Sequence, residues 1–252
     1  MDLLSFREPF NTWSHGLWLL LSIPATVVLW RKSGKDTAKR VTLLIFGLSL
    51  AACYLGSAVF HGVRVDGTHL AVFDRLDHMG IHLLIAGSYT PVAWNLLRGP
   101  WRTWPLIAVW GTTIVASALL LVRIKLPVPV ATCEYLALGW GALFCYVEIA
   151  RVLNRRVLWS LVIGGVCYSI GAVFNLLHWP RPWPGVFGHH EIFHLWVMAG
   201  SSAHFWFMLT AVIPFAGVAT TRTAPGWLAR QDQSVLAAFR GTSGARAEHE
   251  GA

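Results

Sequence analysis

Charged residues are scarce in this sequence. They make up 13% of its 252 residues, about half of the roughly 25% that is usual in soluble domains. Hydrophobic residues account for 55%, and the mean hydropathy is +0.54. This balance excludes an ordinary soluble domain and indicates a single integral membrane domain.

Strands of alternating polarity are also missing, which argues against a membrane barrel. Apolar runs recur instead, each near the roughly 20 residues that a membrane-spanning helix needs. The runs cover residues 13–31, 41–63, 76–97, 104–122, 129–150, 157–177 and 190–215. We therefore expect an all-α membrane protein, a seven-transmembrane-helix bundle within residues 1–216. The polar remainder, 217–252, is expected to be a disordered tail.

Paired cysteines are absent as well. The four cysteines form no CxxC pair, and all lie inside apolar runs: Cys53, Cys133, Cys145 and Cys167. Such positions are typical of buried thiols, rather than of disulfides or zinc ligands.

The net charge of +8 does not indicate nucleic-acid binding here, and we exclude nucleic acid as a partner. The Lys and Arg residues lie in the connections between apolar runs, where they determine orientation in a bilayer. Six of the 20 fall on the side of the N-terminus, and the others fall on the opposite side or in the tail. The positive-inside rule then predicts an external N-terminus and a cytoplasmic C-terminus.

The stretch HHEIFHLWVMAGSSAHF, residues 189–205, carries the strongest chemical signal. His190 and His194 are four residues apart, so on a helix they lie on one face, one turn apart. Two imidazoles in this arrangement are a common half of a metal site. Ionisable groups in membrane segments are costly and mark function by default.

Further ligands must come from other helices at the same depth. Seven crossings place His61, at the end of the second predicted helix, and Asp77, at the start of the third, on the side of His190 and His194. Three neutral imidazoles suit Zn²⁺ at about 2.0–2.1 Å, with a fourth position open for water. Asp77 would accept a proton from that water or orient it. Ser57, one turn before His61, would hydrogen-bond the water or a substrate oxygen.

Other histidines are rival ligands. His78 and His82 are also four apart, and His189 precedes the helical pair but lies off the face of His194. His15 lies at the right depth and stays open as a ligand. His204 lies ten residues beyond His194, about 15 Å deeper on a helix, too far to share its ion.

At these residues the sequence resembles the hemolysin III family. That family is the bacterial branch of the progestin and adipoQ receptor family, in a superfamily with alkaline ceramidases. The motifs come in the family's order along nearly the whole chain: NTWSHG, SAVFH, LDHMGIHLLIAGSYTP, GGVCYSIGAVF and HEIFH. In two places the sequence departs from the family pattern, because His82 and Asn175 stand where an aromatic residue is more usual.

The resemblance implies a seven-helix bundle that holds one Zn²⁺. By motif position, His61, His190 and His194 match the zinc ligands, Asp77 matches the aspartate that holds the water, and Ser57 matches a nearby serine. It therefore favours these residues over the rival histidines.

Site chemistry and resemblance together favour a zinc-dependent hydrolase that cleaves an amide or ester of a lipid-like substrate, such as a ceramide-type molecule. Membrane lipids are then the expected partners. One alternative is a receptor with a structural zinc. Four protein ligands around the zinc, with no position left for water, would indicate this alternative. A second is a membrane-lytic protein, which would need a polar track through the membrane. The sequence disfavours that, because its polar residues gather at one depth.

Overall fold

The computed structural model describes residues 6–216, so the predicted tail, 217–252, lies outside the described residues. Residues 6–216 form eight α-helices and one π-helical turn, and contain no β-strand. The elements are α1 (Pro9–Lys32), α2 (Thr37–Gly62), α3 (Gly67–Leu96), α4 (Pro100–Leu121), α5 (Val128–Trp140), α6 (Leu143–Ala150), α7 (Arg155–Leu177), α8 (His189–Phe207) and η1 (Met208–Val212).

The helices form an all-α membrane bundle, which confirms the predicted fold class. Six helical stretches in residues 6–216 are long and apolar enough to cross a membrane: α1, α2, α4, α5 with α6, α7, and α8 with η1. The remaining long helix, α3, has 30 residues but carries Asp74, Arg75 and Asp77 in its first half. The chain is therefore a multi-pass membrane protein.

The start of α3 depends on one aspartate. Asp66 Oδ1 accepts hydrogen bonds from the backbone N–H groups of Thr68 (2.9 Å) and His69 (3.1 Å). An aspartate at this position satisfies N–H groups that have no partner within the helix. The helix accordingly begins at Gly67, nine residues before the apolar run that starts at 76.

The apolar run 129–150 is divided into α5 and α6 near Gly141. The Tyr89 hydroxyl of α3 donates to the carbonyl oxygens of Leu138 (2.6 Å) and Gly139 (3.2 Å) at this break. A Cβ on Gly141 would lie 3.2 Å from the same hydroxyl. The interruption is therefore stabilised by a contact from another helix, which the local sequence does not reveal.

Small residues let neighbouring helices approach closely, as is typical of membrane bundles. A Cβ on Gly80 of α3 would lie 2.8 Å from the Cα of Cys53 in α2. A Cβ on Gly171 of α7 would lie 2.7 Å from the Cβ of Trp196 in α8. Glycine is thus required where α3 meets α2 and where α7 meets α8.

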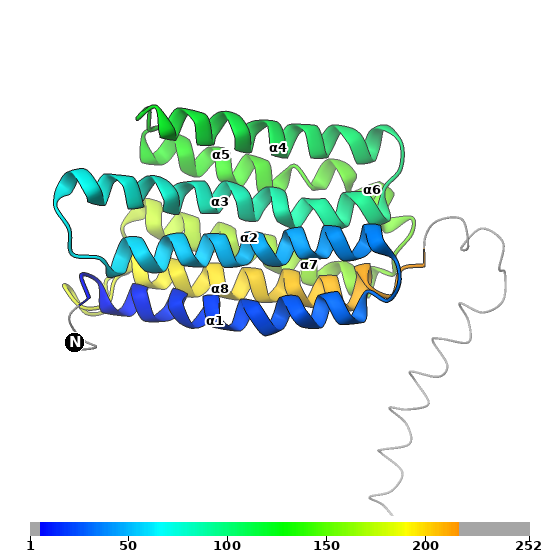
Figure 1. Ribbon diagram of the computed structural model, residues 1–252, viewed down its shortest axis with the longest axis horizontal. Coiled ribbons are helices and arrows are strands. Elements are labelled where there is room, and N and C mark those ends of the chain that lie inside the picture. The colour runs from blue at the N-terminus through cyan, green and yellow to red at the C-terminus, as the bar shows by residue number, and fades with distance from the viewer. Residues whose placement is uncertain (1–5, 217–252) are drawn as a thin grey trace, which may run out of the picture. The chain divides into compact units, whose positions relative to one another are not determined.

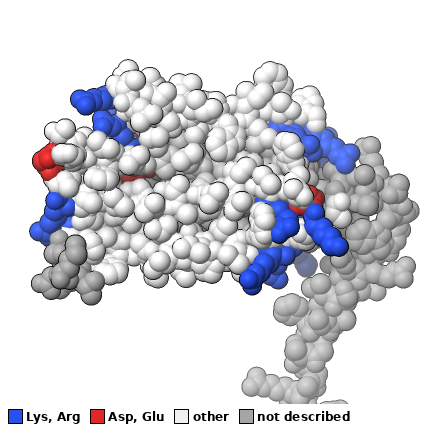
Figure 2. Space-filling model, in the orientation of Figure 1, with Lys and Arg blue, Asp and Glu red and all other residues white. Residues whose placement is uncertain are grey.

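The bundle brings distant segments to one end. The end of α2 and the starts of α1, α3 and α8 lie at the same end of the bundle (Figure 1). Lys and Arg side chains gather at the two ends of the face shown in Figure 2, with an uncharged belt between them. Large apolar side chains such as Phe144 and Trp104 are exposed, as expected for contact with lipid.

Candidate metal centre

Three histidines from two helices meet at that end of the bundle. His61 lies in the last turn of α2, and His190 and His194 lie on the first turns of α8. One ring nitrogen from each falls within 4.8 Å of the others, so the group could hold a metal ion. The His61 and His194 side chains are buried, with 2% and 1% of their surface exposed. The structure therefore brings together the three predicted ligands.

The Nδ1 atoms of His61 and His190 each lie next to a hydrogen-bond acceptor. His61 Nδ1 lies 2.5 Å from Glu8 Oε2, and His190 Nδ1 lies 3.1 Å from Asn175 Oδ1. A carboxylate or an amide oxygen only accepts, so each Nδ1 carries a hydrogen. In the neutral rings each Nε2 is then a bare acceptor, which is the form that binds a metal.

These two bare nitrogens face each other. His61 Nε2 and His190 Nε2 are 3.3 Å apart, a distance at which either a shared proton or a metal ion joins the two nitrogens. Ligands about 2.0–2.1 Å from a tetrahedral ion lie about 3.3 Å from one another. Within residues 6–216, Nδ1 of the buried His194 has no hydrogen-bond partner. The donor set therefore fits a metal ion such as Zn²⁺.

A carboxylate supports His61 from outside the membrane-spanning helices. Burial raises the pKa of Glu8, but its contacts with His61, Asn11 and Arg7 lower that pKa to about 2. Glu8 is thus ionised at neutral pH and accepts from His61. Carboxylate, histidine and metal in series are a frequent arrangement, in which the carboxylate fixes the ring and raises its basicity.

Asn11 connects the supporting residues of the two metal-binding helices. Its Nδ2 donates to Glu8 Oε2 at 3.1 Å and to Glu191 Oε1 at 3.0 Å. Glu191 follows His190 directly, and its Oε2 accepts from the backbone N–H of Gly188 at 2.8 Å. Because Asn11 is only 1% exposed, this amide forms a buried bridge from α1 to the first turn of α8.

The predicted catalytic residues lie beside the histidines. Ser57 is buried, and Asp77 is close enough to His61 and Ser57 for electrostatic interaction. Asp77 and His190 also line one cavity. Asp77 therefore lies near His61 and Ser57 and borders the same cavity as His190.

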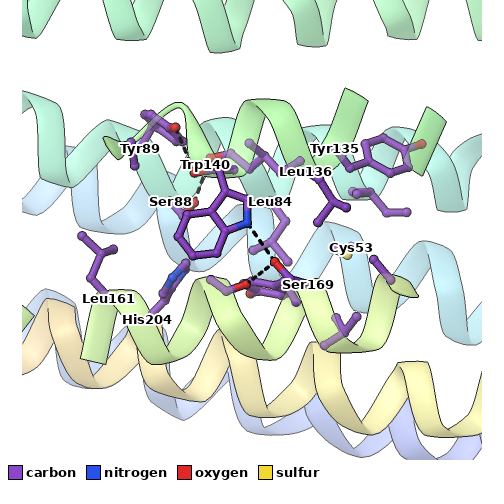
Figure 3. Close-up of a pocket in the computed structure, with 18 of the residues that line it drawn as sticks. Cys53, Leu84, Ser88, Tyr89, Tyr135, Leu136, Trp140, Leu161, Ser169 and His204 are labelled. Carbon is purple, nitrogen blue, oxygen red and sulfur yellow. Dashed lines mark hydrogen bonds between the residues drawn. The ribbon is translucent and has the colours of Figure 1, made fainter. Parts of the chain in front are cut away.

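The cavity has a volume of about 260 Å³ and lies among α3, α5, α6, α7 and α8. Its lining is predominantly apolar and extends along α8 from His190 to Met208, about 27 Å at the helical rise. Figure 3 shows part of this lining, including Trp140, whose Nε1 donates to Ser169 Oγ at 2.8 Å. An elongated apolar ligand would fit with one end at Asp77.

The rival histidines are not members of the three-histidine group. His15 stacks on His194 with ring centroids 3.7 Å apart, and neither of its nitrogens has a partner in the described chain. His189 shares the oxygen of Asn175 at 3.2 Å but lies outside the three-histidine group. His78 and His82 lie in α3, and His204 lies near Gly164 of α7.

Sequence reasoning missed four supporting residues. Glu8, Asn11, Asn175 and Glu191 contact the metal-centre histidines or bridge their helices. The available signal was the spacing of Glu8 and Asn11, an acid and an amide three residues apart at the start of α1. Their partners come from α2 and α8, so the spacing alone does not reveal the contact.

Comparison with known proteins agrees with the motifs. The model of the family described as "Haemolysin-III related" matches residues 5–205. This chain belongs to that family. It is 32% identical to Hemolysin-3 of Bacillus cereus over 213 residues, covering 83% of this chain and 94% of the relative. The human monocyte to macrophage differentiation factor is 30% identical over 213 residues, with 80% of this chain and 82% of the relative covered.

Similarity extends to receptor-type members. The adiponectin receptor protein of Drosophila melanogaster is 23% identical over 220 residues, covering 79% of this chain and 49% of that protein. The predicted resemblance to hemolysin III and adipoQ-type receptors is thereby confirmed.

Proposed function

We propose that this haemolysin III-related protein is a zinc-dependent membrane hydrolase. Its substrate is a lipid-like amide or ester, such as a ceramide-type molecule with an N-acyl bond. The observation that carries the proposal is the approach of two bare ring nitrogens, those of His61 and His190, to 3.3 Å beside His194. Three imidazoles with a fourth position left for water are typical of catalytic rather than structural zinc.

A bound Zn²⁺ would polarise the substrate carbonyl and lower the pKa of a water molecule. Asp77 is the general base of the proposal and holds the proton taken from that water. Ser57, a buried hydroxyl close to Asp77, donates to the oxygen on which negative charge develops. His61, His190 and His194 orient the reacting centre, with Glu8 and Asn175 fixing the first two rings.

The cavity supports the proposed substrate class. Asp77 and His190 are polar members of a lining that is otherwise mostly apolar. Such a space removes an acyl chain from lipid, holds its carbonyl near Asp77 and excludes bulk water. The distribution of Lys and Arg supports an orientation in which the proposed metal centre faces the external side of a bacterial plasma membrane.

A receptor with structural zinc is the second candidate, because relatives include a protein named as an adiponectin receptor. Structural zinc has four protein ligands. His15 is stacked on His194 and is a candidate to complete such a set.

The decisive experiment combines metal analysis of the purified protein with a screen of N-acyl and ester lipids. We expect about one Zn²⁺ per chain and turnover by the wild type. Asp77→Ala keeps the metal and loses about 100-fold or more in rate. His194→Ala loses the metal, whereas His189→Ala, a neighbouring control, keeps it. Full zinc in His194→Ala contradicts the ligand assignment, and a zinc-loaded wild type that hydrolyses none of the lipids contradicts the hydrolase.

A further inference from the structure

A second polar cluster lies inside the bundle, away from the three-histidine group. A cavity of about 340 Å³ is bounded by α3, α4 and the start of α5. Its α4 side is largely apolar and includes Val115 and Leu119. His82 of α3 and Glu134 of α5 face each other across this second cavity, with His82 Nε2 lying 3.3 Å from Glu134 Oε1. Ionisable pairs inside membrane segments are rare and need an explanation.

The hydrogen bonds of His82 determine how many protons the pair holds. His82 Nδ1 lies 3.1 Å from the backbone oxygen of His78. A carbonyl oxygen only accepts, so Nδ1 carries a hydrogen. A neutral His82 then has a bare Nε2, which cannot donate to Glu134. The contact therefore requires one further proton, held either by His82 as imidazolium or by Glu134 as carboxylic acid.

We propose that His82 and Glu134 form a proton-binding site within the transmembrane bundle. Both arrangements contain the same number of protons and have no net charge. Removal of the shared proton would leave an uncompensated carboxylate in a poorly solvated region, which is costly. Glu134 Oε2 is buried and has no hydrogen-bond partner among the described residues. That favours the form in which Glu134 holds the proton and donates it to His82.

Several other ionisable groups lie around this site. On α3, Asp77, His78 and Asp74 lie near it. Lys125, which precedes α5, pairs with Asp74 at 2.7 Å and is partly exposed. Tyr135 of α5 packs edge-on against His82, with ring centroids 4.9 Å apart. Residues of α4 that line the second cavity include no ionisable group.

His78 borders two cavities. It lines both the second cavity and the cavity that contains Asp77. Its Nδ1 lies 2.8 Å from the backbone oxygen of Asp74, so its Nε2 is an acceptor when the ring is neutral. His78 and His82 lie one turn apart on α3. An exchangeable proton is thus stored next to the metal-centre cavity, whether or not the protein is a hydrolase.

Infrared spectroscopy of the detergent-purified full chain tests the proposal. Spectra are compared on the acid and alkaline sides of neutrality for the wild type and for Glu134→Gln, whose amide can still donate to His82. We expect the wild type at neutral pH to show one buried carboxylic acid band or one imidazolium band that disappears on alkalinisation. Glu134→Gln lacks that band. Glu148→Gln is the control, because Glu148 pairs with Arg151 at the surface, and it retains the band.

Isotope labelling identifies the residue type without any substitution. Glutamate labelled at the carboxyl carbon, or histidine labelled in the ring, shifts the band in wild-type protein and assigns it to a carboxylic acid or an imidazolium, and the comparison with Glu134→Gln then assigns it to this pair. If the neutral-pH wild type shows neither band beyond what Glu134→Gln shows, Glu134 is ionised beside a neutral His82 and the proposal is wrong.

Discussion

His61 and His190 face each other with Nε2 atoms 3.3 Å apart, while the Nδ1 of each ring lies within hydrogen-bond distance of an oxygen acceptor, Glu8 or Asn175. Two lone pairs therefore converge on one point beside His194. When both rings are neutral and no ion is bound, this arrangement is repulsive, because neither Nε2 then offers a hydrogen to the other. Bound metal and the native positions of α2 and α8 should consequently stabilise each other.

Metal removal should therefore destabilise the bundle. A ligand that binds the folded protein in 100-fold excess over its Kd contributes about 2.7 kcal/mol. We expect a chelator to lower the thermal unfolding midpoint of the purified wild type by several degrees, and added Zn²⁺ to restore it. His194→Ala, which lacks one ligand, should not respond to either addition. A chelator effect of equal size in that variant would show that the stabilising metal lies elsewhere.

Glu8 should tune the affinity of the metal centre through charge. Glu8→Gln keeps an oxygen acceptor for His61 Nδ1 but removes the negative charge, whereas Glu8→Ala removes both. Loss of a supporting group of this kind typically costs about 10- to 100-fold in metal affinity. We expect competition titration with a chromogenic chelator to give the order wild type, Glu8→Gln, Glu8→Ala. Equal affinities would contradict the role of Glu8.

The pH range of the Glu8 contribution follows from its pKa. Contacts with His61, Asn11 and Arg7 lower this pKa from 4.5 to about 2 in the folded protein. A lowered folded-state pKa gives stability that is present above the ordinary carboxyl pKa and is lost as the pH falls toward about 2. The difference in unfolding midpoint between wild type and Glu8→Gln should therefore stay constant from neutrality down to about pH 5.

Asn11 should matter although it is not one of the three histidines that could hold the ion. Asn11→Ala removes the amide that joins Glu8 to Glu191 and leaves two carboxylates facing each other. We expect about 10-fold or greater loss of metal affinity with helical content unchanged by circular dichroism. Asn95→Ala, which removes an amide that contacts Thr42 instead, is the matched control and should retain wild-type affinity.

Replacing glycine by alanine should destabilise the protein where two helices are in close contact, but not where the glycine faces open space. Gly80→Ala places a methyl group 2.8 Å from the Cα of Cys53, whereas a Cβ on Gly111 of α4 meets nothing within 4 Å. Overpacking of this kind costs about 1–3 kcal/mol. The unfolding midpoint of Gly80→Ala should fall, and that of Gly111→Ala should be unchanged or slightly higher. Equal midpoints would mean that α2 and α3 separate at little cost.

Much of this protein could be predicted from the sequence because the signals are local. Apolar runs of membrane-spanning length indicated the all-α bundle, and the four-residue spacing of His190 and His194 placed both on one face. The seventh predicted helix starts on the side where the second ends and the third starts, so His190 and His194 were expected at the same end as His61 and Asp77. Chain length, hydropathy and helical period are sufficient for each of these inferences.

Only the tertiary structure decided which side chains meet across helices. The contact of Glu8 with His61, the bridge made by Asn11 and the pairing of His82 with Glu134 join residues 52 to 180 positions apart. The division of α5 from α6 likewise depends on Tyr89 of α3. Such contacts depend on the rotation and tilt of each helix, which are set by packing against neighbours. Local sequence signals thus indicate the membrane fold and single out the three histidines, whereas packing between helices determines which acceptors contact the rings of His61 and His190.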